Sequence, residues 1–476
     1  GPGDSMRVLS KPSGVLSVIA RAAAIAVTAW LTVAIPEAAA ENGDNASLAA
    51  SLAARKSALF QQMLRDPSNL DITFAYADVS ARLGDNEAAV AALERMLLFN
   101  PNLARVDLEL GVLYFRMGSF EAARTYFEKA KSFNPPPEVM ARVDEYMAKI
   151  DTNESKNQVS GFIFLGSQYQ SDANVAPGSP LIHSPIGDVL LNNQFVKHDD
   201  GNIFATGTLL YSYDLGTQDR DTIEITGTGF VNHYFQFDRL DLDLGEVTAG
   251  PRLRYPNLGG TPIQSATLKP YLIFNEVGLG ENQYFHTYGV GLETTALLWD
   301  DLSAKISYEF REKNFTNAPD RPLSRGLNGN DNLVSFALSK PLFGNSALSG
   351  EFDYLDQSTR LAFYANKTYS LSAGYRVRYD DPLGWLEFPW ESVVFGSRSW
   401  SIYAAPDPCC NTSGSAVVFS PSARDDRHWR FGVTQSFQVT GGIAVILQVQ
   451  RDIVSSNLPI YGYTSNSVLI GPQIRF

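Results

Sequence analysis

The side chains that most often carry out chemistry in proteins are few in this chain and are not grouped. Five histidines are present, and none stands at the spacing of a metal-binding pair or beside a nucleophile motif. They are His183, His198, His233, His286 and His428. We therefore predict a chain that is not an enzyme and that has no metal or cofactor. A hydrolase built at the rim of a barrel, with His233 or His286 as its base, is the alternative.

The two cysteines form one adjacent pair, Cys409 and Cys410, in a segment rich in Pro, Asn, Ser and Gly. Neighbouring cysteines close only a small strained ring, so they do not form a disulfide framework. A vicinal disulfide and two free thiols both stay open.

Charged residues inside strand-like segments offer a different chemistry, which is the selection of what passes a pore. Rings of charge that line a channel tune its selectivity. The candidates for such a lining are Asp241, Asp243, Lys305, Arg311, Arg376 and Arg378. The alternative is that each is an ordinary solvated wall residue.

These charges belong to segments in which apolar and polar residues alternate. Tyr369, Leu371 and Tyr375 interleave with Arg376 and Arg378 and with small polar residues, and Leu240, Leu242 and Leu244 interleave with Asp241 and Asp243. Such segments recur from residues 159 to 169 as far as residues 467 to 476, and they include the short segment 385 to 388. In a membrane barrel the Leu and Tyr rows would face lipid, and the Asp and Arg rows would face the lumen.

The fold class predicted for residues 159–476 is a transmembrane antiparallel β-barrel of about 14 strands, within an even range of about 12 to 16. Aromatic residues make up 12% of the chain, which favours a barrel with interfacial girdles over a soluble β-sandwich. Long polar connections at residues 171 to 201, 314 to 331 and 404 to 427 are expected on the extracellular side.

The last ten residues read as the final strand of such a barrel. Apolar side chains stand on every second position up to the terminal Phe476. Gly471, Ile474 and Phe476 resemble the signal that the barrel assembly machinery reads, so this machinery is an expected partner.

The first residues read as processing segments. Residues 1–5 precede the first methionine and are set aside, and residues 6–40 have the basic start, apolar stretch and small-residue end of a signal peptide. The mature chain would then start near Glu41, and an uncleaved membrane anchor is the alternative.

Between these two regions lies an internal repeat. Pro67, Pro101 and Pro135 recur at a step of 34 residues, and Gly84 and Gly118 keep the same register. This is the period of tetratricopeptide repeats, in which small residues let paired helices approach and Pro ends the second helix. Two repeats are expected, flanked by helices near residues 46 to 65 and 138 to 150. The repeat domain would span residues 41–150, and residues 151–158 would be a linker.

The first helix of each repeat pair lines the concave groove of such an array. A stacked Arg82 and Arg116 could hold carboxylates or peptide carbonyls. The full set of groove candidates is Asp71, Asp78, Arg82, Arg105 and Arg116. Solvated charges on an exposed face are the alternative.

Charge and hydropathy argue against two classes of protein, which are nucleic-acid-binding proteins and helical membrane proteins. The formal net charge of -13 leaves no basic stripe that could neutralise the phosphates of a nucleic acid. After the signal peptide, no apolar run is long enough for a membrane-spanning helix.

Repeats ahead of a barrel of about 14 strands resemble the surface lipoprotein assembly modulators, the Slam family. The segment 161 to 176, with Gly166, Tyr169, Asp172 and Asn174, is similar to that family's first strand and loop. The resemblance implies an outer-membrane translocation or assembly factor that moves a protein, such as a surface lipoprotein, to the cell surface. It also implies a monomeric barrel in outer-membrane lipid, with the repeats in the periplasm recruiting the cargo or a partner.

Two other functions stay open. One is a polysaccharide secretion porin, because such exporters also carry tetratricopeptide repeats beside a barrel. The other is a passive diffusion porin with a periplasmic docking module.

Overall fold

The computed structural model describes residues 44–66, 69–176, 181–184, 187–190, 196–256, 258, 262–319, 321–342, 345–406 and 422–476. The predicted signal peptide and the pair Cys409 and Cys410 lie outside the described residues. The chain divides into two compact units: the helices belong to one, which ends at Gln158, and the barrel strands belong to the other, from Val159 onward.

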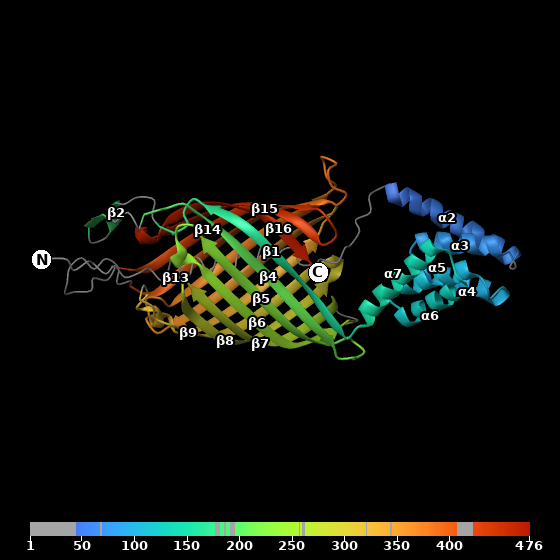
Figure 1. Ribbon diagram of the computed structural model, residues 1–476, viewed down its shortest axis with the longest axis horizontal. Helices are drawn as coiled ribbons and strands as arrows, with labels where there is room; N and C mark the ends of the chain where they lie inside the picture. The colour runs from blue at the N-terminus through green and yellow to red at the C-terminus, as the bar shows by residue number, and fades with distance from the viewer. Residues whose placement is uncertain are drawn as a thin grey trace. The chain divides into compact units, whose positions relative to one another are not determined.

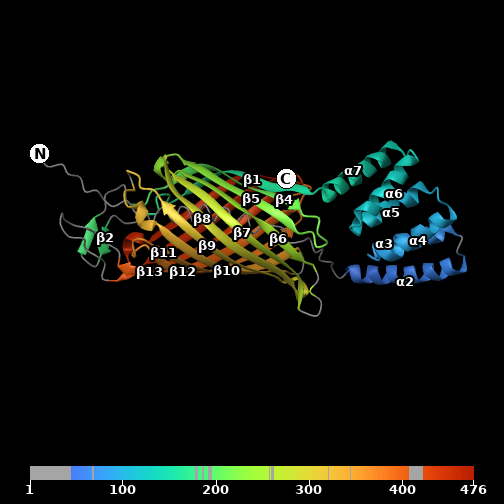
Figure 2. The same ribbon diagram turned by 90° about the horizontal axis from the view of Figure 1, so that it is seen from below.

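The helical unit confirms the tetratricopeptide-repeat fold. In the described part of the chain its elements are α2 (Asp44–Arg65), α3 (Leu70–Arg82), α4 (Asn86–Phe99), α5 (Ala104–Arg116), α6 (Phe120–Ser132) and α7 (Pro137–Glu154). The repeats are the pairs α3 with α4 and α5 with α6, and successive helices pack in chain order (Figure 2). No helix among the described residues is long and apolar enough to cross a membrane.

The repeat glycines act as the sequence predicts. Gly84 and Gly118 have φ angles of 75° and 74°, a left-handed conformation that costs glycine little and lets the chain reverse between paired helices. Gly111 lets α5 and α6 touch, because a Cβ there would lie 2.7 Å from the ring of Phe127. Phe127 is completely buried, so the two helices share a tightly packed seam.

The second unit is a closed antiparallel barrel of 14 strands in the described chain, as predicted. Its strands are β1 (Asn157–Gln170), β4 (Asp200–Asp214), β5 (Thr222–Tyr234), β6 (Leu242–Tyr255), β7 (Ile263–Leu279), β8 (Asn282–Leu298), β9 (Ser303–Phe315), β10 (Gly329–Pro341), β11 (Ser346–Thr359), β12 (Asn366–Tyr379), β13 (Trp390–Pro406), β14 (Ala423–Gln438), β15 (Ile443–Ser456) and β16 (Tyr463–Arg475). A separate hairpin, β2 (Leu181–Ser184) and β3 (Gly187–Leu190), lies between β1 and β4 in the chain.

The barrel has two distinct ends. We call the end where β1 begins and β16 finishes the proximal end, and the opposite end the distal end. The three long connections that the sequence analysis singled out, after β1, β9 and β13, all leave from the distal end. The β2 hairpin and the C-terminus lie at opposite ends of the barrel (Figure 1).

The last strand closes the barrel against the first. The register pairs Phe162 with Arg475 and Gln170 with Ser467, and Phe476 and Gly161 exchange backbone hydrogen bonds of 2.9 and 3.1 Å. Gly471 is required at this seam because a Cβ there would lie 1.9 Å from the carbonyl oxygen of Leu165. Ile474 faces outward and is 43% exposed.

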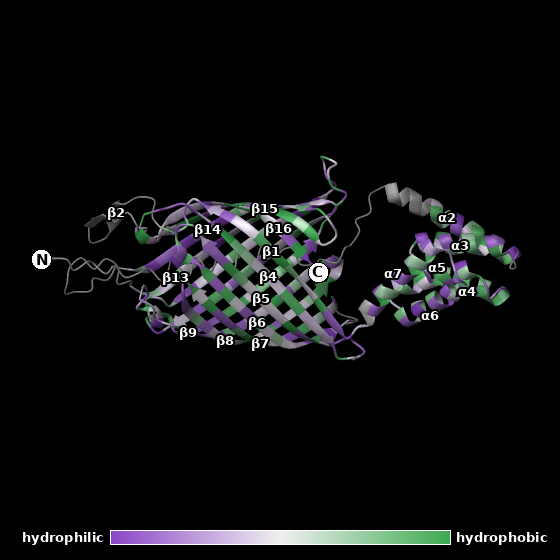
Figure 3. Ribbon diagram, in the orientation of Figure 1, coloured by the Kyte–Doolittle hydropathy of each residue, from purple (hydrophilic) through white to green (hydrophobic). Residues whose placement is uncertain are grey.

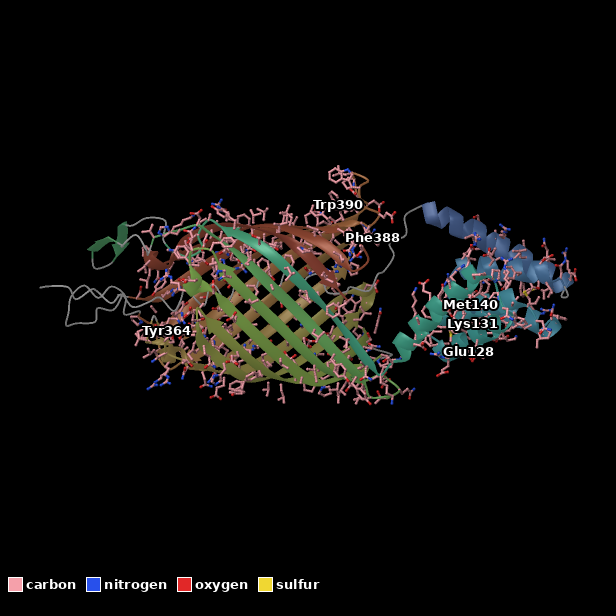
Figure 4. The ribbon with its side chains drawn as sticks, viewed as in Figure 1. Glu128, Lys131, Met140, Tyr364, Phe388 and Trp390 are labelled. Carbon is pink, nitrogen blue, oxygen red and sulfur yellow. The ribbon has the colours of Figure 1, made fainter. Side chains whose placement is uncertain are left out.

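The outer surface is apolar and aromatic over the middle of the strands. Leu272, Val290, Leu371 and Ile470 are among its exposed side chains, and polar residues alternate with them along each strand (Figure 3). Tyr379 and Trp390 mark the proximal edge of this band, and Figure 4 shows Phe388 and Trp390 far from Tyr364, which lies toward the distal end.

Two expectations about strands are wrong. Residues 385 to 388 form no strand: the Asp381 carboxylate accepts hydrogen bonds from the backbone N–H groups of Leu383, Trp385 and Leu386, which folds this segment into the β12–β13 turn. These contacts satisfy backbone donors that a strand would pair elsewhere.

The second error concerns the face of the first part of β6. Leu242 faces inward and is fully buried, whereas Asp243 is exposed and lies directly opposite the outward Val231. Asp241 comes before the strand, where its carboxylate accepts from the backbone N–H of Tyr234. The predicted lumen positions of Asp241 and Asp243 are therefore corrected: Asp243 lies on the outer face, and Asp241 in the distal turn before β6.

Candidate functional site: the charged lumen of the barrel

The alternation of each strand sends one row of side chains into the lumen, and near the proximal end this row is charged on most strands. We call this set the proximal ring. Its members are Glu224, Arg252, Lys269, Glu293, Lys305, Glu351, Asp353, Arg376, Arg378, Glu391 and Arg475. Lys305, Arg376 and Arg378 were expected here, and the structure places them in this ring.

On one side of the ring a chain of ion pairs crosses five adjacent strands. Glu224 on β5 accepts from Arg252 on β6 at 2.7 Å and from Lys269 on β7 at 2.8 Å. Glu293 on β8 lies 3.5 Å from Arg252 and 2.9 Å from Lys305 on β9. Because each carboxylate is shared between two cations, these side chains hold one another in place along the wall.

The same wall continues on β11 with two carboxyl groups. Asp353 accepts a 2.5 Å hydrogen bond from the Ser335 hydroxyl, and Glu351 stands two residues away on the same inward row. The electrostatic influence of Lys305 reaches both groups. This part of the ring is therefore richer in acid than in base.

The opposite wall is mainly basic. Arg376 and Arg378 on β12 both reach Glu391 on β13, at 3.9 and 3.1 Å. Arg475 on β16 lies within electrostatic range of all three. Three guanidinium groups therefore lie within electrostatic range of one carboxylate, and two of them form ion pairs with it.

The ring is electrically polarised across the lumen. From β5 to β11 it holds four carboxylates and three cations, a formal charge of 3 − 4 = −1; from β12 to β16 it holds three cations and one carboxylate, which gives 3 − 1 = +2. Opposed charges of this kind create an electric field across the lumen.

A second layer of polar contacts lies nearer the middle of the barrel. Arg311 on β9 pairs with Glu246 on β6 at 2.6 Å and with Glu309 at 2.8 Å. Tyr271 on β7 donates to Glu309 at 2.6 Å. Arg311 therefore lies in the lumen as expected, and its side chain reaches across two intervening strands.

On β6, β7 and β8 the inner wall becomes apolar toward the distal end. Leu242, Val277, Leu279 and Tyr284 are fully buried there together with Leu327 from the β9–β10 connection. Arg321 of the same connection donates to the carbonyl of Leu279 at 2.7 Å, with its guanidinium over the Tyr284 ring. The distal loop is thus packed onto the inner wall.

Two of the histidines contact carboxylates. His428 contacts the Asp452 carboxylate at 2.8 Å, and Arg430 donates to the same oxygen, while His233 contacts Asp241 at 2.6 Å at the distal rim. Among the described residues, no group of three or more His, Cys, Asp or Glu side chains could hold a metal ion.

The groove candidates of the repeats are all exposed. Asp71 and Arg116 lie open on α3 and α5. Arg82 forms a 3.1 Å ion pair with Asp78 one turn back on α3, and Arg105 lies over the Phe74 ring at 4.6 Å. Arg82 and Arg105 are therefore engaged within the repeats.

A polar network between the repeats was not anticipated. Glu94 on α4 accepts hydrogen bonds from the hydroxyls of Tyr114 and Tyr126, at 2.6 and 3.1 Å, and the two rings stack at 5.4 Å. The hydrogen bond to Glu94 raises the pKa of Tyr114 to about 12, and burial raises the pKa of Tyr126 to about 12. Both phenols therefore stay protonated and join the first repeat to the second.

Sequence reasoning also missed all five carboxylates of the ring, which are Glu224, Glu293, Glu351, Asp353 and Glu391. Glu224, Glu293 and Glu351 each stand in a strand on the row opposite its exposed apolar residues, such as Leu292 beside Glu293. Assigning every strand charge to the row opposite the apolar one would have found them.

The comparisons match this two-part architecture. A tetratricopeptide-repeat model matches residues 108–137. A protein named surface lipoprotein assembly modifier, from Pasteurella multocida (strain Pm70), is 21% identical over 371 residues, which are 75% of this chain and 66% of that protein. The chain is Slam-like. It spans 66% of the length of this relative, just under two thirds.

Solved structures resemble the two parts separately. A loop-deletion mutant of OmpT, an outer membrane protein of Vibrio cholerae, is 7% identical, covers 68% of this chain and 100% of its own, and has a TM-score of 0.33. The Yersinia enterocolitica type III secretion chaperone SycD, in complex with a peptide of the translocator YopD, is 10% identical, covers 23% of this chain and 88% of its own, and has a TM-score of 0.21. A closed barrel with an apolar outer band, in a Slam-like chain, is an outer-membrane barrel protein.

Proposed function

We propose that this chain is an outer-membrane translocation or assembly factor that moves a protein, such as a surface lipoprotein, to the cell surface. The helical repeats lie in the periplasm in this proposal and recruit the cargo or a partner. The barrel then passes or releases the cargo without catalysing a covalent reaction, and the barrel assembly machinery inserts it through the terminal strand that holds Gly471, Ile474 and Phe476.

The observation that carries the proposal is the charged proximal ring, which lies at the end of the barrel where β1 begins. Only Ser155 and Lys156 separate α7 from β1. The ring carries both signs of charge, which suits a polypeptide better than a neutral sugar polymer. The name of the Pasteurella relative, surface lipoprotein assembly modifier, agrees with this class of cargo.

The test is a surface-display assay in a deletion strain complemented with ring variants. Reversing the basic wall with Arg376→Glu and Arg378→Glu should lower the amount of cargo protein that external protease removes from intact cells. Arg360→Glu is the matched control, because this exposed arginine lies in the distal β11–β12 connection, outside the ring. Barrel assembly is verified for every variant by heat-modifiable migration.

Two further measurements separate the alternatives. Loss of extracellular glycan with all surface proteins intact would replace the proposal with polysaccharide secretion. Unchanged surface proteins and glycan, together with altered uptake of small charged solutes, would replace it with passive diffusion.

The repeats are tested separately with Arg82→Ala and Arg116→Ala. If they recruit cargo, the double variant should reduce cargo at the surface and leave small-solute uptake unchanged. Wild-type display by this variant would remove the two arginines from the recruitment surface.

A further inference from the structure

One cation, Arg398, lies on the outer wall of the barrel, where lipid-facing side chains are normally apolar. Arg398 on β13 lies opposite Leu371 on one side and Trp429 on the other. Leu371 and Trp429 are both exposed on the outer face, so Arg398 belongs to the same lipid-facing row. An arginine at the bilayer midplane costs about 2–4 kcal/mol, a cost that falls to about 0–1 near the interface.

Two tryptophans hold this guanidinium on the outer face. Its central carbon lies 4.6 Å from the ring centroid of Trp400 and 4.5 Å from that of Trp429. Among the described residues, the Nε of Arg398 is buried and has no hydrogen-bond partner. The group is thus positioned by its flat faces, and this leaves a donor at its edge without an acceptor within the protein.

The depth of Arg398 follows from the aromatic residues of its own strand. Trp390 marks the proximal edge of the apolar band, and Trp400 stands ten residues further along β13. With a rise of about 3.3 Å per residue and a tilt of about 40°, ten residues climb about 25 Å, the height of the apolar band of such barrels. Trp400 therefore lies at the distal interface, and Arg398 lies just below it.

Three more cations share this outward face near the distal interface. Arg427 lies opposite Trp400, Lys367 opposite the exposed Ile402, and Arg451 opposite the exposed Phe431. We call the four cations, with Trp400 and Trp429, the distal basic patch: Lys367, Arg398, Trp400, Arg427, Trp429 and Arg451.

Two carboxylates lie beside the patch and do not neutralise it. Asp356 lies 3.9 Å from Lys367, and Asp425 lies 3.9 Å from Arg427, both near the limit of an ion pair. Four cations and two carboxylates leave a formal charge of 4 − 2 = +2. Exposed ion pairs of this length contribute little, so the cations stay available to a stronger anion.

The other side of the barrel shows that this charge is local. At the distal ends of β6, β7 and β9 the exposed outward charges are Asp243, Glu276 and Glu312. Glu312 lies opposite the outward Tyr288, at a level comparable to the distal basic patch. A general preference for cations at the distal rim would not produce an acidic wall there.

We propose that the distal basic patch binds the phosphorylated headgroup of a lipid in the outer leaflet. Phosphate oxygens accept from the edges of Arg398 and Arg427, and Lys367 and Arg451 add charge from the two sides. The acyl chains of the same lipid lie against the apolar side chains on the proximal side of the patch, among them Val394 and its cross-strand neighbour Val433. A lipid is favoured over free phosphate because the cations surround tryptophans at the membrane interface.

The test uses the purified full-length barrel in detergent and diphosphorylated lipid A as the probe. Retention of the lipid is measured by native mass spectrometry, for the wild type and for Arg398→Gln with Arg427→Gln. The double variant should bind roughly tenfold more weakly, which corresponds to about 1.4 kcal/mol. Lipid A stripped of its phosphates should bind the wild type as weakly as the variant binds the intact lipid.

Glu312→Gln removes a charge from the acidic wall and should leave retention unchanged. If the double variant does not assemble, Lys367→Gln with Arg451→Gln tests the same patch without touching the residues between the tryptophans. Wild-type retention by an assembled patch variant would overturn the proposal. Displacement of the lipid by millimolar inorganic phosphate would instead show a simple anion site.

Discussion

The helical repeats and the barrel bury opposite kinds of side chain. In the repeats, Leu93, Leu110 and Phe127 form the interior, while Asp71 and Arg116 are exposed. In the barrel the exposed side chains of the middle band are apolar, and ion pairs such as those of Glu224 line the interior. The same residue types therefore occupy opposite positions in the two units, because water surrounds the repeats and lipid surrounds the barrel.

The largest effect of a single substitution is expected on barrel assembly, at the seam where β16 pairs with β1. Gly471→Ala places a methyl group 1.9 Å from the backbone oxygen of Leu165, and backbone cannot move aside as a side chain can. We expect most of the variant to fail to assemble, as measured by the loss of the heat-modifiable band. Gly245→Ala on β6, with nothing within 4 Å of its Cβ, should assemble as the wild type does. Normal assembly of Gly471→Ala would show that the first and last strands can separate locally at this point.

The largest effect in the repeats is expected at their packed seam. Phe127→Ala removes a fully buried ring that touches Gly111 and stacks on Tyr146. The free energy of unfolding of the helices should fall by about 3–5 kcal/mol. Denaturant titration followed by the helical circular dichroism of the full chain measures it, and the barrel should stay heat-modifiable.

The exposed Phe99 provides the matched control for this substitution. Phe99→Ala removes the same ring from a site that is 56% exposed, so its effect should be much smaller, on the order of 0.5 kcal/mol. Equal losses for the two variants would contradict a core at the α5–α6 seam.

A substitution inside the lumen should have a smaller effect than either seam. Glu224→Gln keeps the shape of the side chain but leaves Arg252 and Lys269 without their shared carboxylate. We expect a loss of about 1–3 kcal/mol, seen as a lower temperature for the heat-modifiable transition. Glu312→Gln, on the outer face, should change this temperature little. A stabilised Glu224→Gln barrel would show that burying these charges costs more than their pairing returns.

The smallest effect is expected at the start of α4. Asp85 accepts from the backbone N–H of Ala88 at 3.1 Å and pairs with Lys56 of α2. The hydrogen bond from Lys56, with that of Ala88, lowers the pKa of Asp85 from 3.8. A lowered pKa in the folded state contributes stability that is present above about pH 4 and lost as the pH falls through the folded pKa.

Asp85→Asn keeps the helix cap and removes the charge. The substitution should lower the free energy of unfolding by about 0.5 kcal/mol at pH 7, a small loss because the Asp85 side chain is 43% exposed. The loss should be smaller still at pH 3. Helical unfolding measured at both pH values tests this sign, and a larger loss at pH 3 would contradict it.

Several features follow from local sequence alone. The step of 34 residues predicts both helix pairs, since it is repeated by Gly84 and Gly118, whose left-handed conformation only glycine adopts cheaply. The alternation on β12 predicts which face each residue takes, with Tyr375 outside and Arg376 inside, as the structure shows. Both patterns depend on chain geometry rather than on distant contacts.

Other features need the tertiary structure. The proximal ring joins residues from nine strands, and no spacing along the chain shows that Glu224 and Lys269 share one contact. The Arg398 site likewise combines β13 and β14 through a register that the sequence does not state. Ion pairs over such separations become visible only when the barrel closes.

The start of β6 shows where sequence reasoning ends. Alternation correctly separated Leu242 and Leu244 from Asp243, because successive side chains of any strand point to opposite faces. It did not determine which face was the lumen. In the structure, Leu242 packs in one buried cluster with Leu327 of the β9–β10 connection inside the distal end, while Asp243 lies on the outer face at the rim, beyond the apolar middle band. The sequence by itself determined the two rows, and only the tertiary structure decided their direction.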